Sequence, residues 1–340
     1  MSDPNVHEDR LAPVRAARLR SAVQVIGFLI GLTLLGWCVR TALKPESLAQ
    51  WSRLREAPAG QVALLLALAS ATLLANGETF RIAIAPVKRL GGLHVQAVNA
   101  AASLLAYLPF KLSLLYRVLI HNRRDGVALL TIGAWFGSIA AVLAAALLPP
   151  LGAAALRGRA DAVWWALSVG GVVLATVGMV LVSRRLHDGA GWAWLERVWR
   201  ALRLPSTVLP RVHEGLRILA DPRAVTGGVL LRVIDVGIHT ARFLVVAGLL
   251  GFELPMDKAV IAGCSYFLIG AAAPSGSLGL REALTGGLLG RLLSGIDPDQ
   301  FMVAVLMVTL AELIVLIPAA VVGAAWTRPW SLRPLPRAKP

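Results

Sequence analysis

The sequence is poor in cysteine, in acidic residues and in the motifs of nucleotide-using enzymes. Its 340 residues include two cysteines, Cys38 and Cys264, and both stand in apolar runs. They match no metal-ligand spacing and imply no disulfide framework. No G-x-x-x-x-G-K-[ST] loop occurs, so we do not expect this chain to hydrolyse ATP. We therefore expect neither a metal site nor a cofactor.

Apolar residues are abundant: they make up 57% of the chain, and the mean hydropathy is +0.69. Soluble domains average about 45–50% apolar residues, so this composition indicates an integral membrane protein. About 20 apolar residues span a bilayer as a helix, and no soluble domain of useful length lies between the apolar segments. Six segments are long enough to span: 21–39, 60–80, 127–148, 163–183, 225–250 and 300–326.

Basic residues outnumber acidic ones, which gives a net charge of +15. If the N-terminus is cytoplasmic, 21 of the 34 Lys and Arg residues fall on that side, 8 on the other and five at membrane depth. This asymmetry is the positive-inside pattern. We therefore expect both termini in the cytoplasm and a first span that is retained rather than cleaved as a signal peptide. The natural counter-charge is anionic lipid headgroups, not nucleic acid.

Two further apolar stretches are each interrupted by a proline, with a charge eight residues later. Pro109 precedes Arg117, and Pro274 precedes Glu282. Broken helices and buried charges are costly in hydrocarbon and persist mainly where they line a cavity. We expect each stretch to be a re-entrant hairpin of two half-helices. The alternatives are a pair of short full spans, or a continuous helix kinked at the proline. The stretches run over 93–120 and 259–293.

Aligning the two prolines reveals the same order of elements in two units, residues 60–148 and 225–326. Each unit has a span, a linker, an apolar segment up to the proline, a half-helix, a turn with Asp and a second span. The units begin at the second and fifth crossings, so their orientations are opposite. Such inverted repeats are typical of transporters that bind substrate where broken helices meet near the midplane. The expected parts are a cytoplasmic segment 1–20, an all-α membrane domain 21–326 and a cytoplasmic tail 327–340.

A cytoplasmic segment, residues 184–224, joins the two units. Trp192, Leu195, Trp199 and Leu202 share one helical face there, and arginines lie elsewhere around the helix. Aromatic and basic faces together favour a helix lying on the cytoplasmic leaflet. Packing of this segment against its own bundle is the alternative.

The half-helix after each proline is a candidate anion site. Its first N–H groups are unpaired and its dipole directs positive charge into the membrane, which favours an anion such as a lipid phosphate. Serine hydroxyls can donate hydrogen bonds to that anion, and glycines permit close backbone approach. The predicted substrate-binding residues are Lys111, Ser113, Arg117, Ser275, Gly276, Ser277, Gly279, Arg281 and Glu282.

The span at 225–250 carries a polar seam. Arg232, Asp235, His239 and Arg242 are spaced by three, four and three residues, which places them within an arc of about 80°. We expect this seam to face the cavity, with Asp235 or His239 as a proton carrier. The alternative is an Arg232–Asp235 ion pair with polar ends that reach the interface.

Glu282 and Glu312 are the deepest carboxylates without an obvious neighbour in sequence. A carboxylate in lipid is protonated unless it is paired or hydrated. We expect Arg117 or Arg242 to be the partner, and we expect the pair to couple transport to pH.

The residues around the prolines resemble the transmembrane domain of the lysylphosphatidylglycerol synthase family, also called flippase-like proteins. The likeness extends over about residues 20–326. One family hallmark is a Pro followed by a basic residue two positions later, a Gly four positions later, then a Glu, and an Arg eight positions after the Pro. The other is a Pro/Gly-rich break ending in Gly-x-x-Glu. Matching residues are Pro109, Lys111, Arg117, Gly276, Gly279 and Glu282, whereas Ser113, Leu114, Ser275 and Ser277 depart from the pattern.

The resemblance implies lipid translocation. In larger family members this domain is associated with moving aminoacylated phospholipid between leaflets, and a separate C-terminal domain transfers the amino acid from tRNA. The present sequence ends fourteen residues after its last span. We therefore expect a stand-alone member without the synthase domain.

The expected function is transport of an anionic or phosphate-bearing lipid, a phospholipid or a polyprenol-linked lipid, across the bacterial inner membrane. A non-transporting partner of a lipid-synthesising enzyme is the first alternative. A lipid phosphatase or transferase is the second, because Pro274-Ser275-Gly276 resembles the Pro-Ser-Gly-His of type 2 phosphatidic-acid phosphatases. Ser277 replaces that His, however, and no histidine follows His239. We therefore do not expect an enzyme.

Overall fold

The computed structural model of the protein describes residues 5–44, 51–202, 208–273, 276–293 and 295–331. Over these residues the chain is all-α and contains no β-strand. The predicted break at Pro274 and Ser275 lies outside the described residues. The predicted fold class, an all-α membrane protein, is confirmed.

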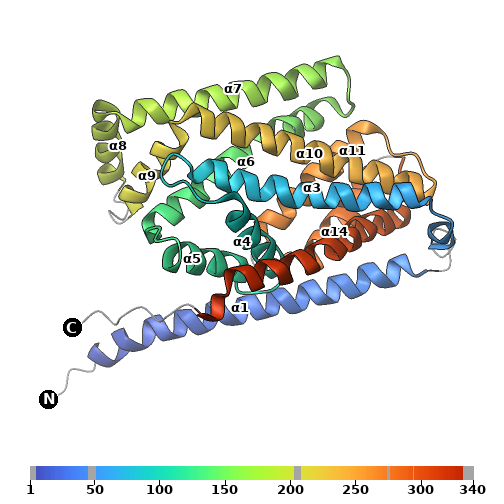
Figure 1. Ribbon diagram of the computed structural model, residues 1–340, viewed down its shortest axis with the longest axis horizontal. Helices are drawn as coiled ribbons and strands as arrows, with labels where there is room; N and C mark the ends of the chain where they lie inside the picture. Colours follow the sequence, from blue (N-terminus) through green and yellow to red (C-terminus); the bar gives the residue numbers. More distant parts are fainter. Residues whose placement is uncertain (1–4, 45–50, 203–207, 274–275, 294, 332–340) are drawn as a thin grey trace.

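Six helices are long and apolar enough to cross a membrane, and they match the six predicted spans. In Figure 1 they run roughly parallel, with α1 along one edge of the bundle and α7 along the opposite edge. The part of α1 that qualifies as a span is Ser21–Ala42. The helices are α1 (Asn5–Ala42), α3 (Ala59–Ile84), α6 (Leu129–Arg157), α7 (Ala162–His187), α10 (Pro222–Leu250) and α14 (Pro298–Thr327).

Aspartate caps fix where three of these helices begin. The Asp221 carboxylate accepts the backbone N–H groups of Arg223 and Ala224 at the start of α10. Asp161 and Asp297 do the same for α7 and α14. A capping side chain satisfies donors that the first helical turn leaves unpaired, which is worth about 1 kcal/mol. The span boundaries are therefore encoded locally in the loop sequence.

The first proline segment folds as two short helices, α4 (Gly92–Leu105) and α5 (Leu112–Arg123). At 1.5 Å per residue they are about 21 and 18 Å long, less than the hydrocarbon thickness of about 30 Å. His94 in the first turn of α4 lies 3.1 Å from Asp125, just beyond the end of α5. The chain thus enters and leaves this segment at the same end of the bundle. That it re-enters the bilayer rather than crossing it stays a prediction.

The second proline segment has a similar arrangement. It consists of α11 (Met256–Ala272) and a returning arm made of α12 (Leu280–Glu282), a π-helical stretch (Ala283–Leu289) and α13 (Gly290–Leu292). Leu254, before α11, and Leu293, after α13, pack in one apolar cluster. This segment therefore also begins and ends at one end of the bundle.

The two proline segments meet tip to tip. The Ser277 backbone N–H donates to the Ala106 carbonyl oxygen at 3.1 Å. Gly276 has a φ of 101°, and a Cβ at this position would stand 2.8 Å from the Tyr107 carbonyl oxygen. Both breaks therefore approach each other through main-chain atoms, at a place where only glycine fits.

The contacts between helices follow the predicted inverted repeat. The first helices of the two units, α3 and α10, pack against each other along the centre of the bundle. Helix α14 packs against α3, and its counterpart α6 packs against α10. Likewise, α4 lies against α14, and its counterpart α11 lies against α6. Exchanging the two units thus leaves the pattern of neighbours unchanged.

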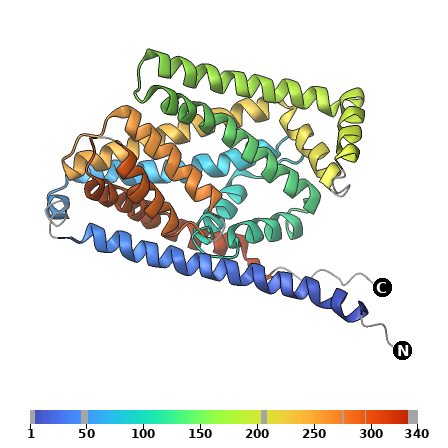
Figure 2. The same cartoon turned by 180° about the vertical axis from the view of Figure 1, so that it is seen from behind.

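Residues 184–224 complete α7 and form two short helices, α8 (Gly189–Ala201) and α9 (Leu209–Leu219), at one end of the bundle (Figures 1 and 2). Helix α9 packs against α6 and α7, and the His213 ring stacks on His187 with a centroid separation of 4.6 Å. Trp192 is half-buried against His213, whereas Leu202 is exposed. The alternative interpretation, packing on the bundle, thus holds for α9 and part of α8.

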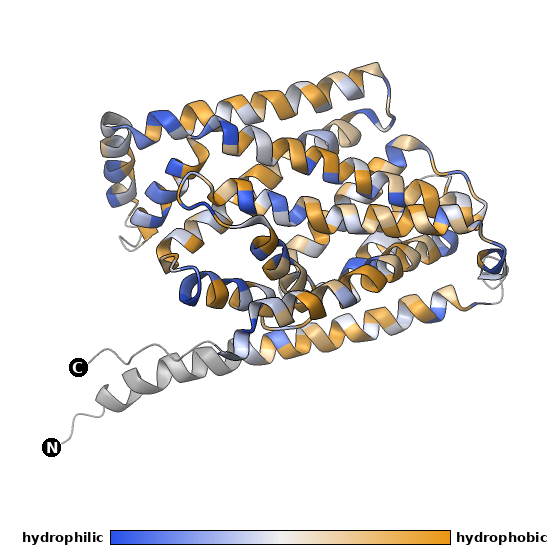
Figure 3. Ribbon diagram, viewed as in Figure 1, coloured by the Kyte–Doolittle hydropathy of each residue, from blue (hydrophilic) through white to orange (hydrophobic). Residues whose placement is uncertain are grey.

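Hydrophilic residues gather at the ends of the bundle, most densely around α5, α8 and α9 (Figure 3). The middle of each long helix is hydrophobic on its outer surface. Leu174 in α7 and Val322 in α14, for example, are exposed to 73% and 67%. Apolar side chains exposed in a belt of this kind are stable in lipid, which agrees with the predicted membrane location.

Candidate functional site

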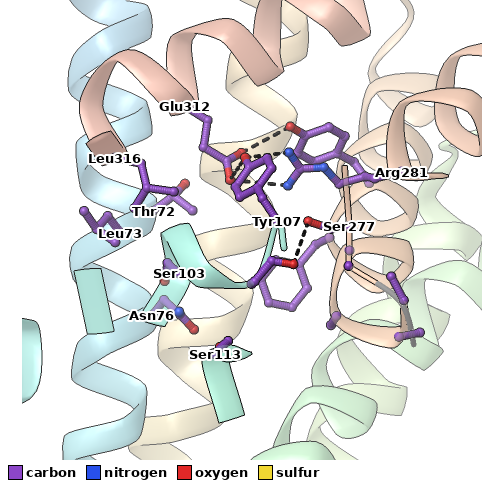
Figure 4. Close-up of a pocket in the computed structure, with 18 of the residues that line it drawn as sticks. Thr72, Leu73, Asn76, Ser103, Tyr107, Ser113, Ser277, Arg281, Glu312 and Leu316 are labelled. Carbon is purple, nitrogen blue, oxygen red and sulfur yellow. Dashed lines mark hydrogen bonds and ion pairs between the residues drawn. The ribbon is translucent and has the colours of Figure 1, made fainter. Parts of the chain in front are cut away.

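A cavity of about 390 Å³ lies where the two breaks meet. Its walls come from α3, α6, α10, α14 and both proline segments. Figure 4 shows Glu312, Arg281 and Tyr107 on one side, and Asn76, Ser103 and Ser113 on the other. The cavity therefore brings together residues from both repeat units.

The first side of the cavity is a closed ion-pair network centred on Glu312. One carboxylate oxygen accepts hydrogen bonds from Tyr107 at 2.9 Å and from Arg281 at 3.3 Å. The other accepts from Tyr266 at 3.2 Å and from Arg242 at 3.3 Å. Both carboxylate oxygens of Glu312 therefore have two donors each, so this buried charge is fully compensated.

Arg281 links Glu312 to the second carboxylate. Its Nε lies 3.2 Å from Glu282, and its Nη2 donates to the Tyr107 hydroxyl at 2.7 Å. The guanidinium also lies over the Tyr266 ring, 4.1 Å from the centroid. With Arg242, this closed network contains two arginines and two glutamates, so its formal charges cancel.

Glu282 corrects one prediction, because its carboxylate fills the anion site that we expected at the second half-helix. Its Oε2 accepts the Gly279 backbone N–H at 2.7 Å, and its Oε1 accepts the Thr309 hydroxyl at 2.9 Å. The helix N-terminus thus already binds an anion, supplied by the chain itself. Gly279, with a φ of 81°, instead lets this turn approach the Gly31 carbonyl of α1.

The second side of the cavity is a cationic group built around Arg117. Its Nη2 donates to the Asn99 Oδ1 at 2.6 Å, and its guanidinium lies 3.9 Å from the centroid of the Phe80 ring. The side chain is only 4% exposed. Among the described residues no carboxylate pairs with it. Of the two partners predicted for the deep glutamates, Arg242 pairs with Glu312 at 3.3 Å, and Arg117 pairs with neither glutamate.

Asparagines connect Arg117 to the polar seam of α10. The Asn76 Nδ2 donates to Asn99 at 2.9 Å, and the Asn76 Oδ1 accepts from Arg232 at 2.6 Å. Arg232 also pairs with Asp235 at 2.9 Å. The cationic group therefore contains two arginines and one carboxylate, and it keeps a formal charge of +1.

Several buried polar atoms next to the cavity have no partner among the described residues. They are Arg117 Nη1, Arg232 Nε, Asp235 Oδ1 and His239 Nε2. Buried polar groups are nearly always hydrogen-bonded in native proteins, to water or ligand where not to protein. Arg117, Arg232 and His239 also line the cavity. Asp235 Oδ1 and His239 Nε2 lie 3.9 Å from each other, whereas Arg117 and Arg232 keep N–H groups at the cavity that can donate to water or to an anion.

The structure sorts the predicted site residues into three sets. Those that line the cavity are Lys111, Ser113, Arg117, Gly276, Ser277, Arg281, Arg232, His239 and Glu312. Those that support it from behind are Asp235, Arg242, Glu282 and Gly279. Pro109 lies in the break between α4 and α5, whereas Pro274 and Ser275 lie outside the described residues.

The asparagines and tyrosines of the site were not among the residues predicted from the sequence. Asn76 and Asn99 bridge the arginines, and Tyr107 and Tyr266 hold Glu312. An asparagine within an apolar span is a signal that was available, because polar side chains at membrane depth usually face a cavity or a partner.

The fold and the site define a polytopic, all-helical membrane protein with a charged cavity between two similarly arranged halves. The chain belongs to the lysylphosphatidylglycerol synthase TM region family, whose family model matches residues 20–320. Neither a curated protein nor a solved structure matches the chain. Membership of this family indicates a role that involves membrane lipids.

Proposed function

We propose that the protein moves an anionic or phosphate-bearing lipid between membrane leaflets, with the headgroup passing through the cavity. One observation carries this proposal: the cavity wall keeps positive charge that no carboxylate of the described residues compensates. The cationic group of Arg117, Arg232 and Asp235 has a formal charge of +1, and Lys111 adds a second positive charge to the lining. A cavity with this excess of positive charge favours an anionic occupant.

Arg117 is the residue we assign to the headgroup phosphate. Its Nη1 is buried without a partner, and phosphate is a strong acceptor for guanidinium N–H groups. Ser113, one turn earlier in α5, also lines the cavity and can donate a second hydrogen bond. The lipid tails stay in the bilayer while the headgroup occupies the polar interior.

We further propose that the end of the bundle with α8 and α9 faces the cytoplasm of a bacterial inner membrane. The helices and loops at this end are rich in arginine, for example Arg184, Arg197 and Arg223, all exposed. Positive charge concentrates on the cytoplasmic side of membrane proteins. Anionic lipids of that leaflet are then partners for the exposed faces of these helices.

A vesicle assay tests the transport proposal. Purified protein is reconstituted with phosphatidylglycerol that carries a fluorescent headgroup, and dithionite quenching reports exchange between leaflets. Wild-type protein should accelerate exchange, and Arg117→Met should slow it at least about tenfold, equivalent to about 1.4 kcal/mol. Arg223→Met, an exposed arginine on α10, is the matched control and should exchange like wild type.

If wild-type and protein-free vesicles exchange at the same rate, the transport proposal is wrong. In that case, the role of a non-transporting partner for a lipid-synthesising enzyme becomes the leading candidate. The exposed Trp194 and Arg197 on α8 are where such a partner would be sought first.

A further inference from the structure

Two histidines and an aspartate converge at the open end of the first hairpin. His94 belongs to the first turn of α4, His121 to the last turn of α5, and Asp125 to the turn that follows. The Asp125 carboxylate lies 3.0 Å from His94 Nε2 and 2.7 Å from His121 Nδ1. One ligand atom from each residue lies within 4.8 Å of the others.

We propose that these three side chains bind a divalent transition-metal ion, and that the ion is Zn²⁺. Two imidazole nitrogens and one carboxylate oxygen are a common donor set for zinc. Ligand atoms about 2.0–2.1 Å from a tetrahedral zinc are about 3.4 Å apart. The Asp125 oxygens now lie 3.0 Å from His94 Nε2 and 2.7 Å from His121 Nδ1, so each contact must lengthen by less than about 1 Å to reach that spacing, and the fourth position is left for water.

The surroundings hold the donors in place and leave one side open. His121 is fully buried and its ring lies 4.9 Å from the Trp135 ring, centroid to centroid. The Asp125 and His94 side chains are 10% and 16% exposed, so an ion can reach them from solvent. The Lys88 ammonium donates to the Asp125 main-chain carbonyl and thereby fixes the turn.

The ring of His121 is held through one of its two nitrogens. Its Nε2 is buried and has no partner among the described residues. Asp125 is therefore the polar group that sets the orientation of this ring, and it directs Nδ1 toward the same point as His94 Nε2.

A bound ion would close the hairpin at its base. It would join the start of α4 to the end of α5, which the chain otherwise connects only through the break around Pro109. His121 stands four residues after Arg117, on the same face of α5, so the ion would also fix the register of that arginine. This inference does not depend on the lipid proposal.

The test uses the full-length protein without an affinity tag in detergent, stripped of metal with a chelator. Zinc binding is measured by competition with a chromogenic zinc indicator, and thermal unfolding is followed with and without zinc. Wild type should bind one zinc ion per chain and unfold at a higher temperature when zinc is present. His94→Ala and Asp125→Asn should each bind at least about a hundredfold more weakly, since loss of a direct ligand exceeds a second-shell effect of 10–100-fold.

His213→Ala is the matched control, because His213 and His187 form the other histidine pair of the described chain. It should bind zinc like wild type. A third variant, His121→Ala, removes the remaining ligand. Because His121 is fully buried, that variant can fail to fold, and His94→Ala then provides the test. Equal zinc binding by wild type and His94→Ala, no stoichiometric binding by wild type, or loss of binding in His213→Ala would each overturn the proposal.

Discussion

The closed network around Glu312 and the cationic group around Arg117 are made of the same kinds of residue but differ in how their charges are met. In the closed network, Arg242 and Arg281 face two glutamates, and every carboxylate oxygen has a donor. Among the described residues, Arg242 Nε is the one buried side-chain atom of these four residues without a hydrogen-bond partner. In the cationic group, Arg117 and Arg232 face a single aspartate, and three atoms of these side chains lack partners. The comparison distinguishes buried charges that stabilise the fold from buried charges that are available to a ligand.

Electrostatics explains why the two arrangements have different consequences. Breaking a compensated buried pair leaves a bare charge and costs about 3–5 kcal/mol. Removing a charge that was never compensated relieves a cost that the fold already bears. Variants in the closed network should therefore lose stability, whereas variants of Arg117 should lose activity alone. Four experiments, from the largest expected effect to the smallest, test this division.

The largest effect is expected from Glu312→Ala in the closed network. It leaves Arg242 and Arg281 without the carboxylate that both contact, and we expect a loss of about 3–5 kcal/mol of stability. The measurement is thermal unfolding in detergent together with the yield of monodisperse protein. Arg291→Ala, an exposed residue of α13, is the control and should unfold like wild type. An unchanged unfolding temperature for Glu312→Ala would show that the network is not structural.

Arg117→Met should have the opposite signature. Methionine is shorter than arginine but is also unbranched and packs well against an aromatic ring such as Phe80, and the substitution removes the uncompensated charge, so stability should stay the same or rise by about 1 kcal/mol. The same variant should slow lipid exchange about tenfold or more in vesicles. A variant that loses stability and exchange together would place Arg117 with the structural charges instead.

Asn99→Asp should add a carboxylate to the cationic group, so that its formal charges cancel. The new carboxylate would stand where Asn99 Oδ1 now lies, 2.6 Å from Arg117. The gain of an ion pair and the loss of the hydrogen bond from Asn99 to the Leu73 carbonyl should offset each other to within about 1 kcal/mol. Lipid exchange should fall because the phosphate then competes with a built-in anion. Exchange at the wild-type rate would contradict the role of the unpaired charge.

Tyr107→Phe should have the smallest effect on lipid exchange. It removes a hydroxyl that donates to Glu312 and accepts from Arg281, while Glu312 keeps three other donors, so the cost should be about 1–3 kcal/mol of stability. Thermal unfolding measures it, and exchange in vesicles should remain near the wild-type rate. A loss comparable to that of Glu312→Ala would mean that the hydroxyl, rather than the ion pairs, holds the network.

The parts of the fold that depend on composition and local spacing could be predicted from the sequence. The six spans follow from their length and apolarity, and the Arg232–Asp235 pair follows from a spacing of three residues on one helix. The break around Pro109 follows from proline in an apolar run. These features need no knowledge of how distant segments pack.

The partners of the deep charges could not be predicted in the same way. Arg281 and Glu312 meet across 31 residues and Arg242 and Glu312 across 70, so only the packing of α10, α12 and α14 brings them together. The hydrogen bond from the Gly279 backbone to Glu282, however, could have been predicted from the sequence. A Glu three residues after the first capping position is the spacing of a capping box, so Glu282 was a candidate for its own backbone.

The contact between the hairpin tips explains why the two halves share a pattern and little residue identity. Ser277 and Ala106 meet through a main-chain N–H and a main-chain carbonyl, groups that nearly every residue possesses. Side chains around this contact can change freely as long as a small, flexible residue such as Gly276 remains beside it. The two tips can therefore change in sequence without losing the main-chain contact that joins them.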